Sequence, residues 1–321
     1  MLCNFYAGCA ACAGTGRVDC ASCAPAEDAA ARALRESAAA RFAKYDAVMG
    51  RHVLAGASAH FNVVCELEPA KADHKRRGPH ELLHLYLERL EAVHAAYLAL
   101  FGLGDKDITA RSELFLWTTE ADHLKLGKAL CGYTTTDPEY MRGLEAITSV
   151  WLDPKKLRDD DALHHVVVHA AVHGIMNVQE PVSWTGKLHM GWADEGLSLW
   201  FEDRLLGAAT GYCFWPAEEM HGLRGGHWRP AVRKLVEDGE PTDFEHLLEL
   251  DTVDMSRTEH ALGFALVDYL VARDAALLGR LLASLRARTP ARDALQEIYG
   301  LSLKDLESAW RAWVLKTYPR H

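Results

Sequence analysis

The 321-residue chain lacks several features that mark whole classes of protein. It contains no run of about 18 apolar residues, the length that a membrane-spanning helix requires. Its N-terminus lacks a charged segment followed by an apolar one, which is the pattern of a secretory signal peptide. We therefore expect a soluble chain with no membrane span and no export signal in the sequence as given. The compartment, a trimmed signal and the native status of Met1 are left open.

An excess of basic charge is also missing. Asp and Glu number 45 against 35 Lys and Arg, which gives a formal net charge of −10. This balance disfavours non-specific binding to nucleic acid, so no nucleic-acid partner is expected. The one basic run, residues 71–77 (KADHKRR), is interpreted as a solvated loop, with a phosphate-binding patch as the alternative. With 49% hydrophobic residues, the chain has the composition of an ordinary globular protein.

Cysteine is scarce outside one short segment. Four of the eight cysteines lie in residues 9–23, C-A-A-C-A-G-T-G-R-V-D-C-A-S-C. Two CxxC pairs can direct four thiolates to one ion, which makes a closed, structural zinc site, and a redox disulfide pair is the alternative. A c-type haem is excluded because neither pair is followed by His. The expected zinc ligands are Cys9, Cys12, Cys20 and Cys23.

A second group of metal-ligand residues lies between residues 161 and 202. His165, His169 and His173 recur every four residues and would share one stripe of an α-helix. His169 and His173, in HAAVH, have the spacing of the zincin motif H-E-x-x-H, whose histidines bind zinc. Glu195, in W-A-D-E-G at the start of a second helix, offers the third ligand. Two histidines and one glutamate leave a fourth position open, as catalytic zinc requires.

Two alternatives for this stripe stay open. Histidines on an apolar helix can be hydrogen-bonded core residues instead of ligands. His165 is an additional candidate ligand, and a site of His165, His169 and His173 would suit copper or iron with an oxidative or storage role.

The order of the expected elements indicates an α+β fold with a small mixed sheet, a metal-binding helix and a helical C-terminal part. Strands are predicted at 61–67, 112–118 and 146–152, and helices at 79–100 and 120–130. His80, His84 and His94 on the first of these helices are interpreted as structural or exposed. The C-terminal helices are predicted at 229–237, 243–250, 258–272, 275–285, 292–299 and 303–318, with Ser302 as an N-cap. The expected domains are a zinc knuckle at 1–25, a linker helix at 26–57 and a zincin-like domain at 58–321.

Two segments resemble known families. The cysteine segment resembles the C-x-x-C-x-G-x-G repeats of the DnaJ-type cysteine-rich region, and this resemblance implies zinc ligation only. Residues 58–318 resemble a gluzincin of the peptidase MA-like family. In that family a strand-rich part leads to an HExxH helix, a W-x-x-E-G helix and a helical C-terminal part. The corresponding pieces here are HAAVH at 169–173, WADEG at 192–196, RTEHALGFALVDYL at 257–270 and YGLSLKDLESAWRAWV at 299–314.

The gluzincin resemblance implies zinc-dependent peptide hydrolysis. It implies His169 and His173 as zinc ligands with Glu195 as the third, and the strand at 146–152 as a sheet edge along which a peptide substrate is held. Family members often have Tyr where His260 stands, so the resemblance also implies an oxyanion-stabilising role for His260, with a hydrogen bond elsewhere on the helix face as the alternative.

Ala170 departs from the motif because it stands where H-E-x-x-H has its general base. Loss of a positioned acid or base typically costs about 10²- to 10⁴-fold in rate, so a chain with alanine here is expected to be inactive or strongly impaired. Three explanations stay open: a natural pseudopeptidase, an enzyme with another base, or an engineered inactive variant. Glu180 and Asp194 are the nearby carboxylates that can be considered as substitutes.

The leading hypothesis is therefore a zinc metallopeptidase scaffold acting on a peptide or protein substrate, whose zinc knuckle recruits or positions a protein partner. The second is a pseudopeptidase that binds extended peptides without cutting them. The third is the three-histidine copper or iron site. The substrate, the cleavage preference and the oligomeric state are not determined by these patterns.

Overall fold

A computed structural model describes residues 2–3, 40–131, 140–142, 147–151, 160–179, 184–210 and 226–320. Within them helices combine with a small mixed sheet, which confirms the predicted α+β class. The chain forms two compact units. Unit 1 comprises Met1–Ala92 and Ala110–Leu163, and unit 2 comprises Val93–Thr109 and His164–His321. The predicted cysteine zinc knuckle lies outside the described residues.

Unit 1 is built on a six-stranded sheet with the order β1-β2-β3-β6-β8-β7. The three central strands β3, β6 and β8 run parallel, and they confirm the three predicted strands. The outer strands β1, β2 and β7 are antiparallel to their neighbours. The strands are β1 Leu2–Cys3, β2 Ala55–Ala57, β3 Phe61–Glu66, β6 Ser112–Trp117, β7 Tyr140–Arg142 and β8 Ile147–Trp151.

The prediction that the strand at 146–152 forms a sheet edge is wrong. Strand β7 pairs antiparallel with β8, with Tyr140 opposite Val150 and Arg142 opposite Thr148, so β7 occupies that edge. The backbone of β8 is therefore paired on both sides and cannot accept a substrate as an additional strand. The three residues of β7 are too few to show an alternating pattern in the sequence.

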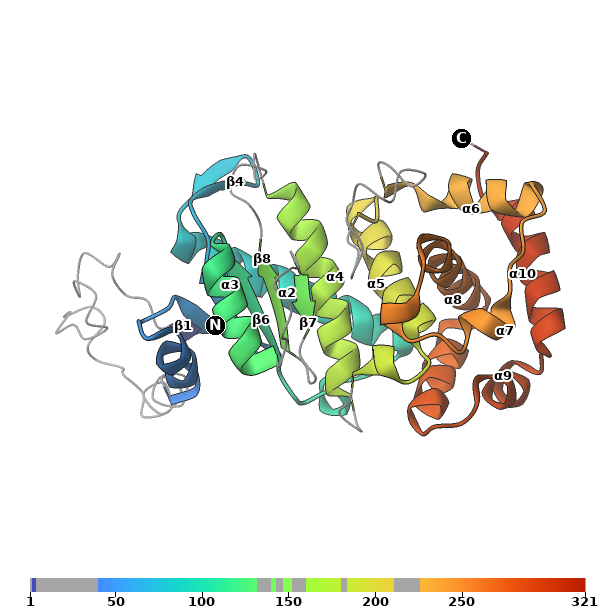
Figure 1. Cartoon of the computed structure of the whole chain (residues 1–321), viewed down its shortest axis with the longest axis horizontal. Helices are drawn as coiled ribbons and strands as arrows, with labels where there is room; N and C mark the ends of the chain where they lie inside the picture. The colour runs from blue at the N-terminus through green and yellow to red at the C-terminus, as the bar shows by residue number, and fades with distance from the viewer. Residues whose placement is uncertain are drawn as a thin grey trace. The chain divides into compact units, whose positions relative to one another are not determined.

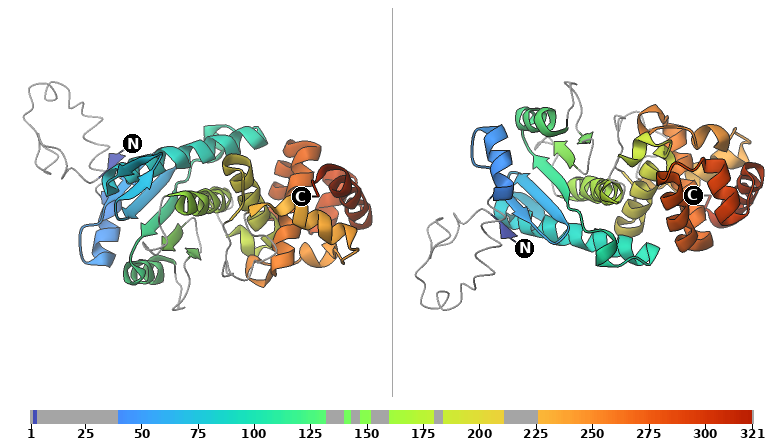
Figure 2. Two further views of the ribbon diagram at one scale, coloured as in Figure 1. Left: turned by 90° about the horizontal axis from the view of Figure 1, so that it is seen from above. Right: turned by 90° about the horizontal axis from the view of Figure 1, so that it is seen from below.

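Different helices cover the two faces of this sheet. Val64, Phe115 and Trp117 pack against Phe42 and Tyr45 of the helix at residues 40–49. The residues that alternate with these along each strand point to the opposite face. The first part of α2 (Pro79–Phe101) runs along that opposite face, and α3 (Glu120–Leu126) lies on the other side of the sheet from α2 (Figure 2).

The expected domain boundary at residue 58 does not separate a linker from the sheet. The described end of the expected linker helix is helical, as predicted, but it packs into the core of unit 1. Strands β1 and β2 also precede the boundary, and both belong to the same sheet.

The basic run at residues 71–77 forms a hairpin, so its interpretation as a loop is wrong. Strands β4 (Ala70–Ala72) and β5 (Lys75–Arg77) pair antiparallel. Asp73 and His74 connect them with φ values of 47° and 64°, the left-handed conformation that two-residue hairpin turns require. An Asp-His turn is a weak signal in the sequence because such turns usually contain glycine.

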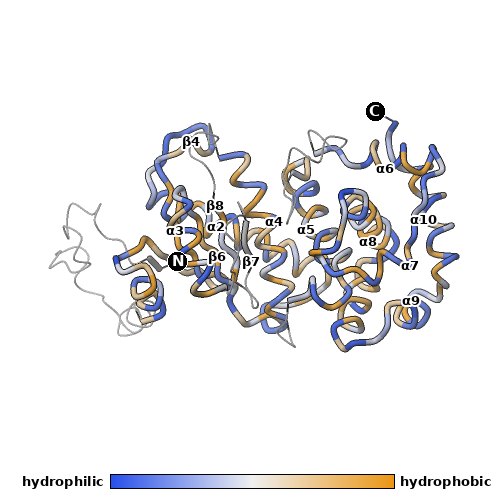
Figure 3. The backbone as a smooth tube through the Cα atoms, in the orientation of Figure 1, coloured by the Kyte–Doolittle hydropathy of each residue, from blue (hydrophilic) through white to orange (hydrophobic). Residues whose placement is uncertain are grey.

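Unit 2 is helical. The outer helices α6, α7, α9 and α10 lie around α8 (Figure 1), and hydrophobic and hydrophilic residues alternate along α6 and α10 (Figure 3). The helices predicted at 258–272 and 275–285 are one helix, α8, interrupted at Asp274. None of the described helices has the length and apolar composition that crossing a bilayer requires. The helices are α4 Asp161–Val178, α5 Gly191–Leu206, α6 Trp228–Glu237, α7 Phe244–Leu247, α8 Arg257–Arg286, α9 Ala291–Tyr299 and α10 Leu303–Thr317.

The backbones of α5 and α8 touch at two glycines. A Cβ atom on Gly196 would lie 2.5 Å from the carbonyl oxygen of Gly263, and a Cβ atom on Gly263 would lie 2.9 Å from the carbonyl oxygen of Trp192. This close approach explains why glycine follows the glutamate in W-A-D-E-G. It also brings Glu195 of α5 beside His260 of α8.

The substitution Gly196→Ala is expected to lower the free energy of unfolding by about 1–3 kcal/mol, because the added methyl group overpacks a contact between two helix backbones. Urea denaturation measures the change. Gly104→Ala is the matched control, since a Cβ atom there would have only one neighbour, the Asp107 carboxylate at 3.7 Å. Equal stability of the two variants would contradict the close packing.

Candidate metal centre

His169, His173 and Glu195 form a compact group inside unit 2. Each is at most 1% exposed. The Nε2 atoms of the two histidines lie 2.9 Å apart, and each lies 3.4 Å from one carboxylate oxygen of Glu195. All three ligand atoms are within 4.8 Å of one another. This group can hold a metal ion, and its members are the three ligands that the sequence predicts.

The outer nitrogens of both histidines are held by carboxylates. His169 Nδ1 donates to Glu202 at 2.8 Å, and His173 Nδ1 donates to Asp194 at 2.8 Å. Because ionised carboxylates only accept hydrogen bonds, Nδ1 carries the proton in each neutral ring and Nε2 carries a lone pair. Metal-binding histidines are oriented in this way.

A positive charge between the Nε2 atoms of His169 and His173 would therefore be stabilising. Two lone pairs 2.9 Å apart repel each other when neither nitrogen bears a proton. A proton shared between the two nitrogens removes the repulsion, and so does a metal ion that accepts both lone pairs. The group thus fits a metal ion by its own hydrogen-bond chemistry.

The two supporting carboxylates are themselves anchored. Thr252 donates its hydroxyl to Asp194 at 2.8 Å, and the backbone N–H of Thr210 donates to Glu202 at 2.8 Å. Asp194 thus has both oxygens engaged, one with His173 and one with Thr252. It is held as the partner of His173, which leaves it poorly placed to act as a general base. The other considered substitute, Glu180, lies outside the described residues.

Both buried glutamates favour the ionised form. Burial acts to raise the pKa of Glu195, but hydrogen bonds and positive charge from His169 and His173 in their protonated form outweigh it and hold that pKa well below its usual value. Burial likewise acts to raise the pKa of Glu202, and hydrogen bonds from His165 and His169 lower it below its usual value. An anionic Glu195 is the form that binds a cation.

His165 does not join the ligand atoms. Its Nδ1 lies 3.1 Å from Glu202, so it contacts the carboxylate that supports His169. The expectation of His165 as a metal ligand, and with it the copper or iron site of His165, His169 and His173, is wrong for this geometry. The four-residue spacing puts His165 on the correct stripe but one full turn too far along the helix axis.

Ala170 is 2% exposed and lies next to His169 on α4. Its methyl group cannot accept or donate a proton. His260, from α8, is fully buried, and its Nε2 lies 3.6 Å from Glu195. The structure therefore places His260 beside Glu195, and its role in stabilising an oxyanion, which the gluzincin resemblance implies, stays a prediction.

A complete H-E-x-x-H sequence, HELLH, occurs at residues 80–84. The interpretation of His80 and His84 as structural or exposed residues did not consider this motif. The Nε2 atoms of His80 and His84 lie 3.0 Å apart at the start of α2. However, Glu81 accepts the N–H of Gly78 at the helix start, and no other His, Cys or acidic residue in the described part of the chain completes a three-ligand group with this pair. The third ligand distinguishes HAAVH from HELLH.

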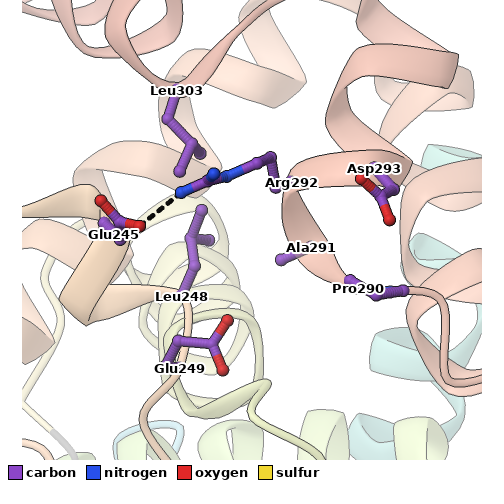
Figure 4. Close-up of a pocket in the computed structure, with 8 residues that line it drawn as sticks. All are labelled: Glu245, Leu248, Glu249, Pro290, Ala291, Arg292, Asp293 and Leu303. Atoms are coloured by element: carbon purple, nitrogen blue, oxygen red, sulfur yellow. Dashed lines mark hydrogen bonds and ion pairs between the residues drawn. The ribbon is translucent and has the colours of Figure 1, made fainter.

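A shallow pocket with a volume of about 330 Å³ lies elsewhere in unit 2 and shares no residue with the metal group (Figure 4). An ion pair between Arg292 and Glu245 crosses it. Its remaining lining is a mixture of short apolar and acidic side chains, without converging ligand atoms. We assign it no role.

The substitution Glu202→Gln is expected to weaken metal binding by about 10- to 100-fold, because the amide cannot hold His169 Nδ1 as firmly as a carboxylate does. Competition with a chelator of known affinity measures the change. Glu237→Gln, on the surface of α6, is the control. An unchanged affinity would show that Glu202 does not support a ligand.

A scan against models of known protein families finds no match, and a search of curated proteins finds no significant relative. The assignment of this centre therefore depends on the residues and geometry of the chain itself.

Proposed function

We propose that this chain is a metallopeptidase-type protein that binds zinc at His169, His173 and Glu195, and that Ala170 leaves its hydrolytic activity absent or strongly impaired. The observation that carries the proposal is the convergence of two Nε2 lone pairs and an anionic carboxylate on one buried point. Two imidazoles and one carboxylate are the ligands of catalytic zinc in gluzincins.

Zinc is the proposed ion because its preferences match the donor set. Imidazole nitrogen suits zinc and other first-row metals, whereas magnesium and calcium prefer oxygen ligands. When bound, zinc supplies an activated water and polarises a carbonyl group. Glu202 and Asp194 orient the two histidines, and Glu195 adds negative charge.

The missing step is proton transfer. A glutamate next to His169 would take a proton from the attacking water and pass it to the leaving amine. Ala170 can do neither. We also propose that the cysteine segment binds a second zinc ion and positions a protein partner.

A pseudopeptidase that binds extended peptides without cutting them is the second candidate, and Ala170 is the observation that favours it. Hydrolysis of a broad peptide library by the zinc-loaded Ala170→Glu variant tests the proposal. Activity supports a peptidase centre, whereas a folded and zinc-loaded variant without activity contradicts it.

A further inference from the structure

His260 has a hydrogen-bonding arrangement that the proposed function does not use. Its Nδ1 lies 2.9 Å from the backbone carbonyl oxygen of Ser256, the N-cap residue of α8. A carbonyl oxygen can only accept a hydrogen bond, so Nδ1 is the nitrogen that carries the proton. The other nitrogen, Nε2, therefore has a lone pair in the neutral ring and no proton to donate to an oxyanion.

This lone pair points into the metal group. His260 is 0% exposed, and its Nε2 has no hydrogen-bond partner in the part of the chain that the structure describes. Glu195 Oε2 lies 3.6 Å from this nitrogen. A buried acceptor without a partner is costly, and an acceptor that faces an anionic carboxylate is more so. A cation between them satisfies both.

His260 shares its arrangement with the two histidines of α4. In all three rings Nδ1 donates to an oxygen acceptor: Glu202 for His169, Asp194 for His173 and the Ser256 carbonyl for His260. In all three Nε2 is turned toward Glu195. Metal sites hold their histidines in this way, with the outer nitrogen fixed by an acceptor and the inner one directed at the ion.

We propose that His260 is a third histidine ligand of this metal centre, which then consists of three imidazoles and the Glu195 carboxylate. The inference rests on the proposed metal site. Ligands of a tetrahedral ion with bonds of about 2.0–2.1 Å lie about 3.3 Å apart. The Nε2 atoms of His169, His173 and His260 lie 3.4, 3.4 and 3.6 Å from oxygens of Glu195.

Of these four residues, only His169, His173 and Glu195 at present have ligand atoms that are all within 4.8 Å of one another. To bind the same ion, the His260 ring must therefore move closer to the rings of His169 and His173. The ring comes from the first turns of α8, whereas the other ligands come from α4 and α5. Binding of the ion therefore joins three helices of unit 2. Zinc can expand to five ligands, so a third imidazole is compatible with a position for solvent.

Nitrogen NMR of the histidine side chains tests this inference on the full chain. Labelling with ¹⁵N-histidine and titration with zinc follows each Nε2 signal, and the His260→Gln variant assigns the signal of residue 260. We expect the Nε2 signals of His169, His173 and His260 to move together to the metal-bound position. If only His169 and His173 move, the third ligand is overturned while the metal site stands. If none of the three moves, the metal site itself fails.

Zinc affinity provides the second measurement. His260→Gln is expected to weaken binding by more than the roughly 10- to 100-fold typical of a residue that only supports a ligand. His246→Gln is the matched control, since His246 lies on the exposed surface of α7 and pairs with Glu259. An affinity equal to that of the control would overturn the assignment. Circular dichroism before and after the substitution verifies that the variant is folded.

Discussion

Replacing Ala170 with glutamate is expected to raise the rate of peptide hydrolysis by about 10²- to 10⁴-fold. Residue 170 follows His169 directly on α4 and occupies the general-base position of H-E-x-x-H. His169, His173, Glu195 and the two carboxylates that hold the histidines are already in place, so under the proposed function the substitution supplies the missing proton carrier. The ratio kcat/KM on a broad peptide library, measured with zinc-loaded protein, gives the change.

Two control variants separate proton transfer from a change of shape. Ala170→Gln adds a side chain of the same size that cannot act as a base, so it should gain no activity. Adding Glu195→Ala to Ala170→Glu should abolish the gain, because a metal ligand is lost. If Ala170→Gln is as active as Ala170→Glu, the general-base explanation is wrong.

The origin of Ala170 can be read from the gene. A glutamate codon at position 170 in genomic DNA would identify the alanine as an engineered inactivation and would rule out the pseudopeptidase. An alanine codon would leave the pseudopeptidase and an enzyme with another base, which the Ala170→Glu activity then distinguishes.

Zinc at about 1,000 times its dissociation constant is expected to raise the free energy of unfolding of the unit that binds it by about 4 kcal/mol. The unfolded chain does not bring His169, His173 and Glu195 together, since they come from two different helices. Zinc therefore binds the folded state preferentially. Urea denaturation with zinc and after chelation measures the difference.

The cysteine segment can also bind zinc, so the measurement needs a variant that isolates the helical site. His173→Ala removes one ligand from α4 and leaves the cysteines intact. The zinc effect that remains in this variant is assigned to the cysteines, and the effect that it loses is assigned to the centre. An undiminished zinc effect in His173→Ala would contradict metal binding by this group.

The local patterns predicted most of the elements well. The apolar periods of α2, α4 and α8 and the central strands β3, β6 and β8 agree with the structure to within a few residues. Short elements were missed, as β7 and the hairpin β4–β5 show, because two or three residues display no period. The break within α8 was placed correctly, but the two predicted helices proved to be one interrupted helix.

The sequence by itself determined which residues can bind a metal. The four-residue spacing of His169 and His173 puts both on one face of a helix, and this is a property of local geometry. The sequence W-A-D-E-G identified Glu195 as the third candidate ligand. Ala170 stands, by its position alone, where the H-E-x-x-H motif has its general base.

Only the tertiary structure decided which candidates meet. His165 and His173 are equally spaced from His169 in the chain, yet His165 contacts Glu202 and His173 contacts Glu195, because these pairings depend on where α5 lies relative to α4, which the sequence does not encode locally. His260 is 65 residues from Glu195 in the numbering, and it reaches the centre because Gly196 and Gly263 let two helix backbones touch. Spacing along the chain selects a helix face, but contacts between helices depend on packing.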